Sequence, residues 1–121
     1  MASDLLYYHG QTRTAVHDLA SSADASGNGV EVLAAVVGAT LYAMGWVYHN
    51  AAVGALTFTL TAGAGAGGAV AIGAPILVAA GATVYVNYSV PLAADAVSRN
   101  IGVVVSGAGQ VELEVWGYYT V

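Results

Sequence analysis

The stretch ALTFTLTAGAGAGGAVAI, residues 55–72, decides the fold class of this chain. Leu56, Phe58 and Leu60 alternate with threonines in its first part. Successive side chains of a strand point to opposite faces of a sheet, so this pattern predicts a half-buried β-strand with threonines on the wetter face. A glycine-alanine run and a second apolar run follow. Together they favour a hairpin whose loop uses glycine to adopt positive φ angles.

The same glycines match the dinucleotide-binding spacing G-x-G-x-x-G at positions 63, 65 and 68. That fingerprint needs a helix after the third glycine, to hold the pyrophosphate, and an acidic residue about twenty positions later. Gly73 and Pro75 would break such a helix, and residues 86–90 contain no acid. A P-loop is excluded because the chain contains no Gly-Lys-Ser/Thr. The sequence therefore favours a loop, and no cofactor is expected.

The rest of the chain after residue 29 also shows strand patterns separated by glycine-rich turns. This spacing of short strands and turns predicts an all-β antiparallel sandwich, jelly-roll-like in topology, over residues 30–121. Residues 1–29 are predicted to be an extended N-terminal arm. Residues 21–29 are turn-rich, and the weakly amphipathic residues 11–23 suffice for only one or two helical turns. The expected strands are 30–37, 40–50, 55–61, 69–72, 75–80, 82–90, 100–107 and 110–121.

Charge is scarce in this sequence. Charged residues make up 7% of the chain and hydrophobic residues 58%, with two arginines, no lysine and a formal charge of −5. Nucleic-acid binding needs clustered basic residues, so it is not expected. Residues 32–94 carry no charge, but glycine, asparagine and proline interrupt them, and no membrane partner is expected either. A domain with so few charges has a surface poor in charge, which is unfavourable for a free monomer. We therefore expect other subunits to cover much of that surface.

No constellation in the sequence indicates catalysis or metal binding. The chain has no cysteine, and its three histidines lack a metal-ligand spacing. Glu112 and Glu114 share one face of a predicted strand, where they would serve as an acid/base pair, as calcium ligands or, as the sequence favours, as the polar face of a sheet. Asp95 and Arg99 would form an ion pair if residues 91–100 make a helical turn. We expect no enzyme and no metal.

Tyrosine and tryptophan are abundant for a chain with so few charges. Such rings serve protein cores, subunit interfaces and carbohydrate sites. Core and subunit packing is the more frequent use, so it is the role expected of the strands that bear Tyr42, Trp46, Tyr85 and Trp116.

Three runs carry a resemblance to a known class of protein: LYAMGWVYHNAAVGALTFTLTAGAGAGG, PILVAAGATVYVNYSVPL and IGVVVSGAGQVELEVWGYY. Over about residues 40–121 the chain resembles small virion proteins of tailed phages, namely capsid decoration (cement) proteins and fibre-head modules. The resemblance implies a jelly-roll sandwich, a homotrimer and a position on the outer capsid surface, bound to the major capsid protein. It also implies that the N-terminal arm reaches neighbouring capsomers.

The expected function is therefore that of a structural virion protein on the capsid surface. The residues expected to dock it lie in the arm: Leu5, Leu6, Tyr7, Tyr8, Val16 and Leu19. The alternative is a phage fibre or adhesin head module that holds host glycan with exposed tyrosines.

Overall fold

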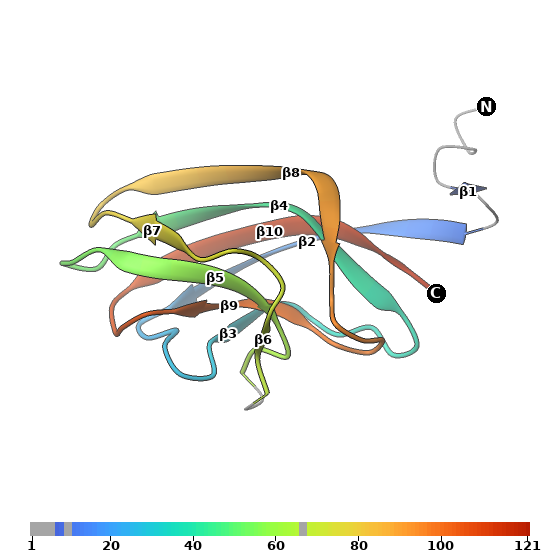
Figure 1. The fold of residues 1–121 in the computed structure, drawn as a ribbon, viewed down its shortest axis with the longest axis horizontal. Helices are drawn as coiled ribbons and strands as arrows, with labels where there is room; N and C mark the ends of the chain where they lie inside the picture. Colours follow the sequence, from blue (N-terminus) through green and yellow to red (C-terminus); the bar gives the residue numbers. More distant parts are fainter. Residues whose placement is uncertain (1–6, 9–10, 66–67) are drawn as a thin grey trace.

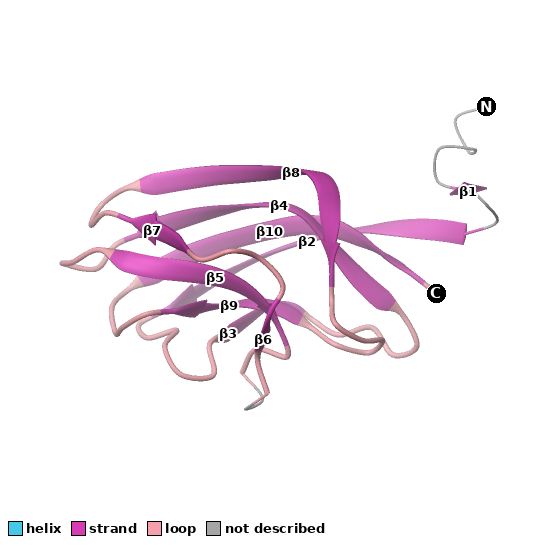
Figure 2. Ribbon diagram, viewed as in Figure 1, coloured by secondary structure: helices cyan, strands magenta, loops and turns pink. Residues whose placement is uncertain are grey.

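The computed structural model describes residues 7–8, 11–65 and 68–121. Within these ranges the chain forms ten strands and no helix (Figures 1 and 2). The strands are β1 (Tyr7–Tyr8), β2 (Gln11–Ser22), β3 (Val30–Leu33), β4 (Thr40–Asn50), β5 (Leu56–Ala62), β6 (Val70–Ala71), β7 (Ile76–Val78), β8 (Thr83–Ala93), β9 (Ile101–Val105) and β10 (Val111–Thr120).

The strands form two antiparallel sheets packed as a sandwich, which confirms the predicted all-β sandwich class. Sheet I has the order β1-β2-β10-β4-β8. Sheet II has the order β3-β9-β5-β6, with β7 also paired to β5. Figure 1 shows the two layers one above the other, with β8, β4, β10 and β2 in one and β5, β9 and β3 in the other. Each strand after β2 lies within or next to a stretch expected from the sequence.

The strand pairs follow the course of one long hairpin. From its tip outward, β5 pairs with β6 and β7, β4 with β8, β3 with β9 and β2 with β10. The hairpin is folded over itself, so that β10 also pairs with β4, and β9 with β5. The glycine-rich run is the tip of this hairpin.

The core between the sheets is centred on three aromatic rings. Trp46 and Tyr48 stack with centroids 3.8 Å apart, and Phe58 meets Tyr48 edge-on at 4.3 Å. These side chains are at most 1% exposed. The Trp46 indole Nε1 donates to the Tyr88 hydroxyl at 2.7 Å, which satisfies a buried donor. Trp46, expected to serve core or subunit contacts, is thus a core residue.

The predicted arm is wrong for residues 11–22. These residues form β2, a twelve-residue strand, which pairs with β10 from Ser22↔Val111 to Arg13↔Thr120. The predicted helical turns are absent there as well. The strand was missed because its inward side chains are small and only half-buried, as Val16 and Ala20 show, so its alternation is weak. Ala25 is fully buried and belongs to the core. Of residues 1–10, the structure describes only the β1 pair.

The glycine run connects β5 to its antiparallel neighbour β6, as predicted for a hairpin. Gly63 and Gly65 have φ of 77° and 80°, a conformation that favours glycine, and the described residues after the loop lead into β6 rather than into a helix. Arg99 donates from Nη2 to the Ala62 and Gly68 carbonyl oxygens at 3.3 and 2.8 Å. Arg99 also pairs with Asp95 at 3.1 Å, although residues 94–100 are an irregular loop. Arg99 therefore clamps both sides of the hairpin tip.

Replacing Arg99 with alanine removes both carbonyl hydrogen bonds and the Asp95 pair. We expect the free energy of unfolding, measured by urea denaturation, to fall by about 1–2 kcal/mol. The matched variant Asp95→Ala removes only the half-exposed ion pair and should cost less than about 1 kcal/mol. Equal losses in the two variants would contradict the clamp.

The buried tyrosines predict how stability depends on alkaline pH. Burial raises the pKa of Tyr48 well above its ordinary value, with a further rise from the neighbouring Tyr88, whose own pKa is raised by burial. The pKa of tyrosine in the unfolded chain is about 10. Below that pH a tyrosine with a raised folded-state pKa is neutral in both states, and the folded state keeps its full stability. Above that pH the unfolded chain loses the proton first, so the folded state loses stability as the pH rises towards the folded-state pKa. The melting temperature should fall above about pH 10, and fall less in Tyr48→Phe. Identical alkaline profiles would refute this assignment.

Candidate functional site

The outer face of sheet I is the candidate functional surface. In β10, Val111, Leu113 and Val115 are buried in the core, so the alternate residues project from the opposite side of the sheet. β10 pairs with β2 and β4, and β4 pairs with β8, so this face extends over four strands. The outer face comprises Arg13, Ala15, His17, Leu19 and Ser21 of β2; Glu112, Glu114, Trp116, Tyr118 and Thr120 of β10; Thr40, Tyr42, Gly45, Val47 and His49 of β4; and Thr83, Tyr85 and Asn87 of β8.

Aromatic rings occupy the middle and one end of the outer face. Tyr42 and Tyr118 stack with centroids 4.9 Å apart, and the Arg13 guanidinium lies 4.9 Å from the Tyr118 ring centroid. That contact is a cation–π interaction, which holds the arginine against the Tyr118 ring. Trp116 lies over Gly45, whose missing side chain leaves space for the indole. The register shift between Trp116 and Gly117 is a bulge at the same place.

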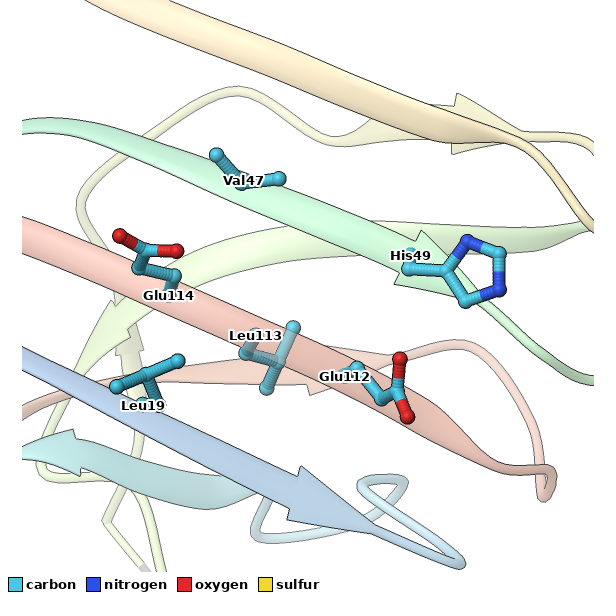
Figure 3. Close-up of a pocket in the computed structure, with 6 residues that line it drawn as sticks. All are labelled: Leu19, Val47, His49, Glu112, Leu113 and Glu114. Carbon is cyan, nitrogen blue, oxygen red and sulfur yellow. The ribbon is translucent and has the colours of Figure 1, made fainter.

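The other end of the outer face is polar. His17 Nε2 donates to Glu114 Oε1 at 2.6 Å, and His49 Nδ1 shares a hydrogen bond with Thr83 Oγ1 at 2.8 Å. Figure 3 shows Glu112 and His49 at one side of a shallow pocket, with Glu114, Val47 and Leu19 farther along the strands. Within the described ranges, no group of three His, Cys, Asp or Glu residues is arranged to hold a metal ion.

Apolar side chains on this face are open to solvent. Leu19 is 65% exposed and Tyr85 is 72% exposed. Of the other exposed hydrophobic residues, some lie in loops, such as Val37 and Val53, and others lie on strands, namely Met44, Val70, Leu77 and Val90. A face on which aromatic and apolar side chains surround the His17–Glu114 pair, with Arg13 and Glu112 at its two ends, is typical of a surface that contacts a partner.

The structure brings four of the sequence-predicted residues together on the outer face: Leu19, Tyr42, Tyr85 and Trp116. Val16 points to the other side of β2, where it is half-buried against the core, and Trp46 is inside it. Tyr7 and Tyr8 form β1, paired to Thr12 and Gln11. Leu5 and Leu6 lie outside the described residues.

Sequence reasoning missed Arg13 and Tyr118 as members of this surface. The alternation Glu112, Glu114, Trp116 continues to Tyr118 beyond the glycine at 117, and would have placed that ring on the same face. Arg13 had no such signal, because its strand was expected to be part of an arm.

No protein-family model matches the chain, and no curated protein matches it by sequence. In the part of the chain that the structure describes, no helix has the length and hydrophobicity needed to cross a membrane.

The close fit of Trp116 over Gly45 gives a direct test of the outer face. A Cβ at position 45 would collide with the Trp116 ring and lie 2.6 Å from the Val86 carbonyl oxygen. Gly45→Ala should therefore lower the free energy of unfolding by about 1–3 kcal/mol, the usual cost of overpacking. Gly54→Ala is the matched control, because nothing lies within 4 Å of a Cβ there. Equal stability of the two variants in thermal denaturation would contradict this packing.

Proposed function

We propose that the protein is a structural virion protein: a decoration (cement) protein that binds the outer surface of a tailed-phage head. In this proposal it contacts the major capsid protein, assembles as a homotrimer and performs no catalysis. The observation that carries the proposal is the outer face of sheet I, a broad surface on which aromatic and apolar side chains surround a central His17–Glu114 pair. A protein that packs against a shell and against its own copies needs such a surface.

The strand pairing supports the jelly-roll part of the proposal. One long hairpin folded over itself places β2-β10-β4-β8 in one layer and β3-β9-β5 with β6 and β7 in the other. Jelly rolls of eight strands in two sheets recur in viral capsid and lectin domains. Because one fold hosts many functions, the topology supports the proposal only together with the outer face.

Docking to the head is assigned to the N-terminal residues Leu5, Leu6, Tyr7 and Tyr8. Leu19 has a different setting, on the outer face, and Val16 packs toward the core. Subunit contacts are assigned to the outer-face residues Tyr42, Tyr85 and Trp116.

Deleting residues 1–10 tests the docking assignment while leaving β2 in place. A longer deletion through residue 25 would remove β2 and its pairing with β10, so it would test folding instead. The shortened chain should keep the circular dichroism of the full chain and lose at least about tenfold in affinity for purified heads, which is about 1.4 kcal/mol. Co-sedimentation with the heads measures the binding.

The control for this experiment is Val53→Ser, which removes a fully exposed apolar side chain from a loop and should bind like the unmodified protein. Head binding retained by the shortened chain would overturn the docking assignment. Failure of the full chain to bind heads would overturn the proposed function.

The second candidate, a fibre or adhesin head that binds glycan, is favoured by one observation: the 72% exposure of Tyr85 on the same face as Trp116. Sugars stack on such rings. A glycan array distinguishes the candidates, because saturable binding that is lost in Tyr85→Ala, together with no binding to heads, would establish the alternative.

A further inference from the structure

The charges of the outer face are separated along the strands. Arg13 of β2 lies at one end of the face, where it pairs with Thr120 of β10. Glu112 of β10 lies at the opposite end, where it pairs with Ser21 of β2. Eight strand positions between Arg13 and Ser21 amount to about 27 Å, so Arg13 and Glu112 cannot pair within one copy. Glu114 differs, because His17 already hydrogen-bonds it. The chain's other arginine, Arg99, is engaged at the glycine loop.

We propose that the outer face of sheet I binds the outer face of a second copy of this chain, in a two-fold contact centred on Trp116. A two-fold axis in the plane of the contact and perpendicular to β10 reverses the strand direction in the second copy. It places Arg13 of each copy over Ser21 and Glu112 of the other. Trp116 is equally far along β10 from Glu112 and Thr120, so it remains at the centre.

Charge complementarity selects this occupant. The face carries a basic end and an acidic end, and the two-fold operation matches them twice in one contact. The middle of the face, where Trp116, Tyr42 and Val47 surround the hydrogen-bonded His17–Glu114 pair, meets itself, as inner faces do when two sheets pack about 10 Å apart. A partner with one sign of charge would leave one end of the face unmatched.

The size of the face limits the strength of the contact. Four strands spaced about 4.8 Å apart, over a paired length of about 27 Å, present roughly 500 Å² of flat area on each copy. The pair would bury about 1,000 Å², which is the threshold for a biological interface and lies in the range of weak, reversible contacts. The inference does not depend on the proposed function. The two-fold contact uses Tyr42 and Trp116, the same residues to which the proposed function assigns subunit contacts, and places them in a dimer instead of a trimer.

Charge exchange across the contact tests the inference, with sedimentation equilibrium of the full chain as the measurement. Arg13→Glu places acid on acid, and Glu112→Arg places arginine on arginine. Each single variant should weaken the association at least tenfold and halve the mass observed at low micromolar concentration. The double variant Arg13→Glu/Glu112→Arg restores opposite charges in the contact and should recover the mass of the unmodified protein.

Asp18→Arg is the matched control, because Asp18 is exposed on the same strand but points to the other side of it. It should leave the mass unchanged, and circular dichroism should show all variants folded. An unmodified chain that sediments as a monomer would overturn the inference. So would single variants that keep the full mass, a double variant that does not recover it, or a control that loses it.

Discussion

The antiparallel pairing of β10 between β2 and β4 is the constraint on which the rest of the structure depends. Each of these two pairings extends from Val111 to Thr120. A strand with period two has one register that buries Val111, Leu113 and Val115, and a slip by one residue would bury Glu112 and Glu114 instead. Burying unpaired carboxylates costs far more than burying valine gains, so the register of sheet I is strongly determined. The same register sets the composition of the outer face.

Two glycines adapt this regular sheet to large side chains. Gly45 lets the Trp116 indole lie close to the backbone of β4, and Gly117 sits at the bulge, where a Cβ would meet the Tyr42 carbonyl oxygen. The Trp116 indole consequently packs against the backbone of β4. An aromatic side chain that is already held in place loses little freedom on contact with a partner.

The two arginines of the chain have separate structural tasks. Arg99 closes the tip of the long hairpin by donating to carbonyl groups on both sides of the glycine loop. Arg13 lies on Tyr118 at one end of the outer face. In a protein with 7% charged residues, each such group has few competing neighbours, and its position has a correspondingly large effect on what the surface can bind.

The sequence by itself determined the fold class and most of the strands. The alternation at Leu56, Phe58 and Leu60, and again at Val111, Leu113 and Val115, is a local property that survives any arrangement of the strands. The failure of the nucleotide fingerprint was also local, because Gly73 and Pro75 forbid the required helix.

Only the tertiary structure decided that residues 11–22 form a strand. Their inward side chains are too small to produce a clear alternation of apolar and polar residues, and the free edge of β10 supplies the pairing. It also decided the outer face, because bringing Arg13, Tyr42 and Tyr118 together depends on pairings between strands far apart in the chain, which local patterns do not encode.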